Sequence, residues 1–157
     1  ILSAISVGLY FGVPPKLINE TIQEYEAPNL RSQQIQLGTN TIILDSYNAN
    51  PTSMRAAISA FDKVNAKQKA VIIGDMLELG TSSVQEHNDM IYFIEQFKFD
   101  LIVFVGKEFM KAKNGNLGLY LPDVKTARKW FYRQKFENTH ILLKASRGIS
   151  IERILNY

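Results

Sequence analysis

Short apolar runs alternate with amphipathic stretches along most of the chain, and this alternation constrains the fold more than any other feature. The runs occur over residues 41–44, 70–73, 101–105, 117–121 and 141–143. Apolar runs of this length, bounded by polar residues, are typical of strands buried on both faces of a parallel sheet. The segments between them carry apolar residues at helical spacing, which is typical of helices that cover such a sheet.

Helix start signals support this division. Asn50 stands before Pro51, which is typical of an N-cap followed by the first helical residue. Ser83 and Glu86 have the spacing of a capping box, and Asp123 opens the third helix. The expected apolar faces of the three helices are Met54, Ile58, Phe61 and Val64, then Met90, Ile91, Ile94 and Phe97, then Val124, Ala127 and Phe131.

The N-terminal part follows a different pattern. We expect two short helices over residues 1–11 and 15–25, a linker over 25–32, and a hairpin over 33–46 that turns at Gly38-Thr39-Asn40. The chain therefore predicts an α/β fold, a Rossmann-like, doubly wound and mostly parallel sheet with an antiparallel N-terminal hairpin strand and a short helical lead-in.

Composition excludes several classes of protein. The 157 residues are 46% hydrophobic and 21% charged, which is not typical of a disordered tail, a coiled coil or a disulfide scaffold. The net charge of +3 comes without a dense stripe of Lys and Arg, so we expect no nucleic-acid partner. Cysteine is absent, which excludes thiolate chemistry and fits a cytoplasmic protein.

The apolar start of the chain is shorter than the roughly 20 residues that span a bilayer, so we expect no membrane partner. It has no initiator Met, so we expect this sequence to be a piece of a longer protein. The two histidines, His87 and His140, are far apart in the sequence, and we expect no metal site.

Polar residues gather directly after the expected strands. In an open parallel sheet these loops meet at one edge, where ligands bind and helix N-termini favour anions. A mixture of acids and bases there suits a nucleotide or zwitterionic ligand. The residues are Asp45, Asn48, Asp75, Glu78, Lys107, Lys144, Ser146 and Arg147.

Some of these residues also have a structural interpretation. Asn48 and Asn50 can serve as turn and cap residues, Asp75 can stabilise a loop, and His87 borders an apolar face where a packed histidine is expected. The chain has no Gly-x-x-x-x-Gly-Lys-Ser/Thr phosphate loop, no Gly-x-Gly-x-x-Gly fingerprint and no Gly-x-Ser-x-Gly elbow. It therefore carries no complete catalytic apparatus of its own.

Four motifs nevertheless resemble the Mur ligase family. They are DSYNANPTSM at 45–54, VIIGDMLELG at 71–80, EH at 86–87 and LLKASRG at 142–148. The resemblance implies that residues 1–30 are the last helices of a central ATPase domain with its linker, and that residues 31–157 are the C-terminal Mur ligase domain. The missing N-terminal and central domains would supply the phosphate loop and the metal ligands.

The resemblance also implies an activity. It is an ATP- and Mg²⁺-dependent ligase that joins D-alanyl-D-alanine to UDP-N-acetylmuramoyl-tripeptide through an acyl phosphate, in peptidoglycan synthesis. We expect a cytoplasmic monomer whose isolated C-terminal part is inactive. Lysine and arginine side chains can stabilise the negative charge of the phosphoryl group in transfer, and domain closure excludes water from the acyl phosphate.

Site residues follow from the motifs. Arg31 would approach the ATP phosphates, and Asp45 would lie near the ribose, although Leu44 stands where many relatives carry a second acid. The remaining assignments are Tyr47, Asn48 and Asn50 in the nucleotide and amine cleft, Lys144, Ser146 and Arg147 for the dipeptide carboxylate, and Asp75 and Glu78 in a substrate loop that they either order or present.

Three other functions stay open. A sister Mur ligase would prefer another amine as its best substrate. A free-standing nucleotide- or ligand-binding module of flavodoxin-like topology would have no ligase partner. A pure interaction module would show no ligand response from the loops at the strand ends.

Overall fold

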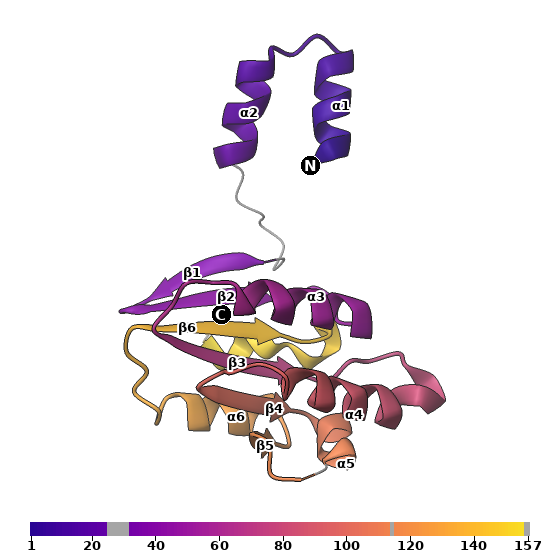
Figure 1. The fold of residues 1–157 in the computed structure, drawn as a ribbon, viewed down its shortest axis with the longest axis vertical. Coiled ribbons are helices and arrows are strands. Elements are labelled where there is room, and N and C mark those ends of the chain that lie inside the picture. The colour runs from indigo at the N-terminus through magenta and orange to yellow at the C-terminus, as the bar shows by residue number, and fades with distance from the viewer. Residues whose placement is uncertain (25–31, 114, 156–157) are drawn as a thin grey trace.

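The computed structural model describes residues 1–24, 32–113 and 115–155, and it is built around one six-stranded sheet (Figure 1). The strand order is β1-β2-β6-β3-β4-β5. Strand β1 pairs antiparallel with β2, and every other pairing is parallel, which confirms the predicted sheet. The strands are β1 (Gln33–Leu37), β2 (Asn40–Asp45), β3 (Gln68–Gly74), β4 (Leu101–Val105), β5 (Leu119–Leu121) and β6 (Thr139–Lys144).

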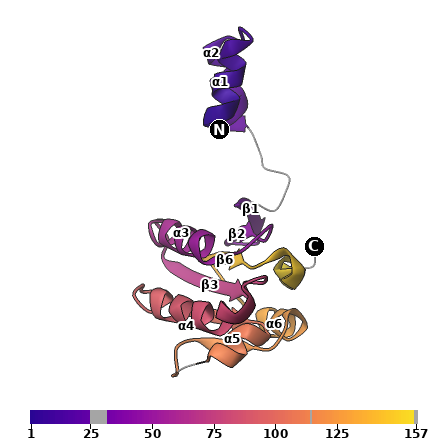
Figure 2. The same cartoon turned by 90° about the vertical axis from the view of Figure 1, so that its right-hand side faces the viewer.

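Helices cover both faces of this sheet (Figures 1 and 2). Helices α3 (Pro51–Asp62), α4 (Ser83–Ile94) and α5 (Lys107–Ala112) pack on one face, in an apolar cluster that includes Met54, Met90 and Phe109. Helix α6 (Val124–Phe131) and the 3₁₀ segment η3 (Ile151–Leu155) pack on the other face, around Phe131 and Ile154. The sheet is therefore doubly wound, as predicted.

Burial explains the apolar runs. Val71, Ile72 and Ile73 in β3 have no exposed surface, although successive side chains point to opposite faces. Each face of β3 must therefore meet a layer of helices. The run in β6 is buried in the same way, and these two strands lie side by side in the middle of the sheet.

The structure corrects several local predictions. Helix α5 was not expected, and the capping box at Ser83 is wrong. Helix α4 begins at Ser83 after the 3₁₀ turn η1 (Gly80–Ser82), and its N-cap Ser82 makes no side-chain cap bond. The Ser83 hydroxyl instead donates to Glu108 of α5 at 3.0 Å, so a tertiary contact replaces the local one. The box that forms is at α3, where Asn50 and Ser53 bond reciprocally.

After β6 the chain forms two 3₁₀ segments, η2 (Arg147–Ile149) and η3. Strand β5 begins only at Leu119, because Gly118 has a positive φ of 70° and lies against the Ile102 carbonyl of β4.

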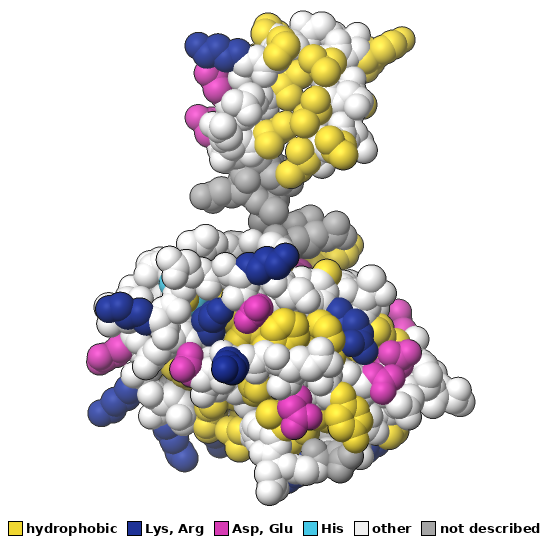
Figure 3. Space-filling model, viewed as in Figure 1, with side chains coloured by type: hydrophobic (Ala, Val, Ile, Leu, Met, Phe, Trp, Pro, Cys, Tyr) yellow, Lys and Arg dark blue, Asp and Glu magenta, His cyan; other side chains and the backbone are white. Residues whose placement is uncertain are grey.

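Two helices precede the sheet, α1 (Leu2–Tyr10) and α2 (Pro15–Glu24), as predicted. Neither contains a buried residue, and Figure 3 shows apolar side chains gathered over this pair. The linker prediction lies outside the described residues apart from Ser32, and so does Arg31. No helix within the described ranges is long and apolar enough to cross a membrane.

Candidate functional site

The carboxyl ends of all five parallel strands lie along one edge of the sheet. Asp45 is level with Lys144, Gly74 with Val105, and Val105 with Leu121 in the strand register. We call this region the strand-end edge, and it comprises residues 45–50, 74–80, 106–108, 121–124 and 144–148. The polar residues singled out in the sequence therefore come from loops at one edge, as expected.

Asp45 and Lys144 form an ion pair at the ends of β2 and β6. Lys144 Nζ donates to Asp45 Oδ2 at 2.7 Å and to the Asn48 carbonyl at 3.1 Å. Lys144 is 1% exposed, so its ammonium group is enclosed between these partners. The other carboxylate oxygen, Asp45 Oδ1, receives no hydrogen bond from any described residue, and the side chain is 18% exposed. Asp45 thus has one carboxylate oxygen bonded to Lys144 and one without a hydrogen bond among the described residues.

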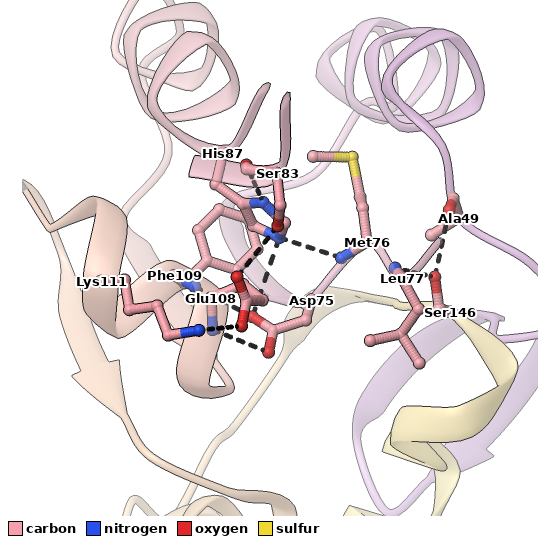
Figure 4. Close-up of polar contacts among 10 residues, drawn as sticks. All are labelled: Ala49, Asp75, Met76, Leu77, Ser83, His87, Glu108, Phe109, Lys111 and Ser146. Carbon is pink, nitrogen blue, oxygen red and sulfur yellow. Dashed lines mark hydrogen bonds and ion pairs between the residues drawn. The ribbon is translucent and has the colours of Figure 1, made fainter. Parts of the chain in front are cut away.

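Asp75, directly after β3, is buried at 3% exposure and lines the larger of two hollows described below. Its Oδ1 accepts from the Phe109 amide and its Oδ2 from the Glu108 amide, each at 3.0 Å, so the carboxylate caps the start of α5 (Figure 4). Both N–H groups would otherwise lack an intrahelical partner. The close approach requires Gly106, because a Cβ there would overlap the Asp75 carboxylate and its φ is 127°.

His87 makes a hydrogen bond with Met76, the residue that follows Asp75 in this loop. It is fully buried, its Nε2 accepts from the Met76 amide at 3.1 Å, and its Nδ1 lies 2.7 Å from the Ser83 carbonyl (Figure 4). These partners assign the proton to Nδ1 and make the ring neutral. The 3.8 Å approach of Nε2 to Asp75 is therefore not an ion pair. The packed histidine expected from the sequence is confirmed.

Ser146 joins three loops of the strand-end edge. Its hydroxyl donates to the Ala49 carbonyl at 3.1 Å and accepts from the Leu77 amide at 2.9 Å, and its own amide donates to the Asp75 carbonyl at 3.1 Å. Figure 4 shows the side chain between Ala49 and Leu77. Since its donor is already used and the residue is 3% exposed, Ser146 fixes the loops in this arrangement.

Other predicted residues are exposed. Tyr47, Asn48, Glu78 and Arg147 all face solvent, and Glu78 has a positive φ of 64°, which is uncommon for a residue other than glycine. Asn50 is also exposed, but its side-chain oxygen accepts from the Ser53 amide at 2.8 Å as the cap of α3. The exposed residues of the motifs are thus fewer than the motif residues singled out in the sequence.

Two hollows open beside these residues. One of ≈ 530 Å³ lies where the loops after β3, β4, β5 and β6 meet, with Lys107, Lys125 and Gly148 in its wall. The other, of ≈ 250 Å³, lies between β2 and α3, with Asp45 beside Phe61 and Leu142. Asp45 therefore lies in the wall of a hollow whose other lining residues are uncharged.

Two carboxyl groups near the larger hollow have lowered pKa values. The pKa of Glu108 lies below its ordinary value because Lys111 and Ser83 donate hydrogen bonds to the carboxylate. The pKa of Asp123 is lowered because the Thr126 amide donates to it at the start of α6. Glu108 is therefore stabilised in the charged form by two neighbouring side chains, and Asp123 by the start of the helix that it caps.

Sequence reasoning missed part of this arrangement. It did not identify Gly106 as the residue that admits Asp75, or α5 as the helix that Asp75 caps. Gly106-Lys107 directly after a strand was the available signal. It also missed Glu152, a buried carboxylate in η3.

The side chains that the structure describes do not fit a magnesium site. Within the described ranges, no group of three or more His, Asp or Glu residues lies together as metal ligands would. Asp45 Oδ1 does fit a nucleotide, since a partly exposed carboxylate oxygen can accept a hydrogen bond from a ribose hydroxyl.

Comparisons with known proteins agree on one family. The family model described as "Mur ligase, glutamate ligase domain" matches residues 30–147. Among curated proteins, the UDP-N-acetylmuramoyl-tripeptide–D-alanyl-D-alanine ligase of Bacillus subtilis is 32% identical over 98% of this chain and 36% of its own length. The Escherichia coli protein of the same name is 28% identical over 98% of the chain and 35% of its own length.

Solved structures give the same result. A crystal structure of MurF from Acinetobacter baumannii matches 95% of this chain and 34% of its own, with a TM-score of 0.83 and 30% identity. A MurF ligase from Thermotoga maritima in complex with ADP shares the fold at a TM-score of 0.78, with 21% identity over 97% of this chain and 35% of its own. The chain thus spans about a third of the length of these relatives.

Proposed function

Because the chain belongs to the Mur ligase family, we propose that it is the C-terminal domain of a ligase that joins D-alanyl-D-alanine to UDP-N-acetylmuramoyl-tripeptide. The proposal depends on one observation above all. The family-like motifs come together at the strand-end edge, in a chain similar over nearly its whole length to curated ligases of that name. The activity belongs to a longer protein than this chain, one that works in peptidoglycan synthesis in the cytoplasm.

The domain division is part of this proposal. Residues 1–30 are assigned to the end of a central ATPase domain and its linker, and residues 31–157 to the C-terminal domain. The uncovered apolar side chains in and directly after α1 support this division, since Leu2, Tyr10 and Phe11 are 75–83% exposed, and Leu17 of α2 is 51% exposed. Apolar patches of this kind are typical of surfaces that another part of a protein covers.

The reaction transfers one phosphoryl group and forms one amide bond. The tripeptide carboxylate attacks the γ-phosphorus of ATP and releases ADP, which gives an acyl phosphate. The amine of D-alanyl-D-alanine then attacks the acyl carbon, loses a proton and expels phosphate. The Mg²⁺ ion that such a transfer uses, and the phosphate loop, are assigned to the central domain. The C-terminal domain closes over the intermediate and excludes water.

Residues of this chain would bind and orient the two substrates. Asp45 Oδ1 accepts from the ribose of ATP, and Lys144 sets the position of Asp45. We assign Arg31, which lies outside the described residues, to the ATP phosphates, and Arg147, with its exposed guanidinium, to the dipeptide carboxylate. Tyr47, Asn48 and Asn50 line the cleft, and Ser146 and Asp75 hold the loops from which these groups and Glu78 project.

Phosphate release by the full-length protein that contains this chain tests the function. ATP, Mg²⁺ and the UDP-linked tripeptide are supplied with D-alanyl-D-alanine or with single amino acids in turn. Fast release with the dipeptide alone is the expected result. Release with a different amine would indicate a sister Mur ligase, and no release with any amine would contradict the proposal. The isolated chain is expected to form no product.

A further inference from the structure

Glu152 is a buried carboxylate that the proposed reaction has not used so far. It lies in η3 and is 8% exposed. Its Oε1 accepts from Arg147 Nη1 at 3.1 Å, and its Oε2 is buried without a hydrogen-bond partner among the described residues. A buried carboxylate with one unsatisfied oxygen costs free energy, so a functional reason for its presence is expected.

Its partner, Arg147, is exposed where Glu152 is buried. The Arg147 side chain is 59% exposed, and no other described residue makes a hydrogen bond or ion pair with its guanidinium. Arginine carries five N–H donors in a rigid plane, so a contact at Nη1 leaves a second edge free. That edge has the geometry that binds a carboxylate through two parallel hydrogen bonds.

The backbone between these residues brings them together. Segment η2 starts at Arg147, and Ser150 at its C-cap has a positive φ of 56°, which reverses the chain into η3. Ile151 and Ile154 of η3 are buried in the core, so Glu152 is fixed to a rigid segment. The exposed Arg147 guanidinium therefore donates to a carboxylate whose own segment is fixed in the core.

We propose that Glu152 is a positioning residue, which orients the Arg147 guanidinium so that its free edge binds the carboxylate of the incoming amine substrate. This inference rests on the proposed function, because it assigns that carboxylate to Arg147. Without Glu152 the long arginine side chain samples many rotamers in solvent. Binding the carboxylate then requires ordering it first, which weakens substrate binding more than it slows the chemical step.

The test uses the full-length protein and Glu152→Met, an apolar replacement of similar volume. Because the Arg147 side chain is 59% exposed, this change leaves no buried unpaired charge and removes the unbonded buried Oε2, so the melting temperature is expected to stay or rise. The KM for D-alanyl-D-alanine is expected to rise about tenfold, while kcat and the KM for ATP change less than about twofold. Glu152→Gln, which keeps an oxygen acceptor, is expected to be intermediate.

Asp62→Asn is the matched control. Asp62 forms a 3.8 Å ion pair with Lys69 at the opposite end of the sheet and is 42% exposed, so its loss should leave the KM for the dipeptide unchanged. Arg147→Gln and the double variant Arg147→Gln/Glu152→Met supply the decisive comparison. If Glu152 acts through Arg147, adding Glu152→Met to Arg147→Gln raises that KM by less than about twofold.

Three results would overturn the inference, and each differs from failure of the proposed function. They are an unchanged KM for the dipeptide in Glu152→Met, a KM increase that persists in full in the Arg147→Gln background, and a lowered melting temperature in both Glu152 variants with no change in KM. An inactive wild-type protein would instead contradict the ligase assignment itself. Wild-type kinetics with the dipeptide are therefore measured first.

Discussion

Asp45 and Asp75 occupy the same kind of position, since Asp45 ends β2 and Asp75 comes directly after β3, yet their surroundings are opposite. Asp75 is 3% exposed, and two backbone amides of α5 use both of its oxygens. Asp45 accepts from Lys144 through one oxygen, its other oxygen has no hydrogen bond among the described residues, and the 18% exposed side chain lines a hollow of ≈ 250 Å³. Two aspartates at strand ends can therefore differ in whether both carboxylate oxygens are bonded within the protein.

The difference arises from the segment that each strand leads into. After β3 the chain passes over the start of α5, and Gly106 lets the two segments touch. After β2 the chain runs into the exposed loop of Tyr47 and Asn48, and the neighbour of Asp45 is the end of β6. Four changes can break or sharpen this comparison, and they are given from the largest expected effect to the smallest.

Gly106→Ala should be the most damaging change. The new Cβ overlaps the Asp75 carboxylate, and the backbone at φ 127° strongly disfavours a side chain. We expect a loss of about 3 to 4 kcal/mol in the free energy of unfolding. Urea unfolding followed by the fluorescence of Trp130 measures it. Gly80→Ala, with a φ of 56° and open space around it, is the control for the backbone effect alone. Equal losses would mean that the contact with Asp75 is unimportant.

Asp75→Ala should remove the cap of α5. The Glu108 and Phe109 amides lose their acceptor in a buried setting, and we expect a loss of about 2 to 3 kcal/mol in stability. The same unfolding experiment checks this value. If Asp75 is architectural, the fraction that remains folded keeps the KM values of the wild type. A variant that is as stable as the wild type but has lost substrate binding would mean that Asp75 contacts substrate rather than maintaining the architecture.

Asp45→Asn should act mainly on the nucleotide. Its amide oxygen can still accept from Lys144, whereas the charged acceptor for the ribose is lost. We expect the KM for ATP to rise about tenfold, or about 1.4 kcal/mol, with the KM for the dipeptide nearly unchanged. Phosphate release by the full-length protein measures both constants. A fall in melting temperature without a change in the KM for ATP would mean that Asp45, like Asp75, has a structural role.

Asp123 extends the comparison to an exposed aspartate after β5. The Thr126 amide lowers its pKa, so its contribution is complete above the pKa of the unfolded chain, about 3.9, and is lost as pH falls through the lower folded pKa. Asp123→Ala should cost about 0.5 to 1 kcal/mol at pH 7. The difference from wild type should shrink below about pH 4. Urea unfolding at a series of pH values checks this, and a gap that stays constant with pH would contradict the capping role.

Most of the fold could be predicted because its signals are local or periodic. Each of the five apolar runs overlaps a strand, and Asn50-Pro51 marked the start of α3 correctly. The errors occurred where a contact from elsewhere replaced a local signal. Ser83 has the right spacing for a capping box, but its hydroxyl bonds Glu108 across a separation of 25 residues. Helix α5 has only six residues, too few for a periodic pattern.

The candidate site could likewise be predicted in part, since the location of its residues follows from the sequence but their exposure does not. The sequence by itself determined which residues lie at the strand-end edge, because strands that run parallel must end together. It could not determine which of them meet solvent. Only the tertiary structure decided that Asp75, Lys144 and Ser146 are enclosed while Glu78 and Arg147 are exposed, and that Glu152 lies beneath Arg147. The physical reason is that burial and hydrogen-bond satisfaction depend on groups contributed by distant segments, such as the α5 amides that surround Asp75.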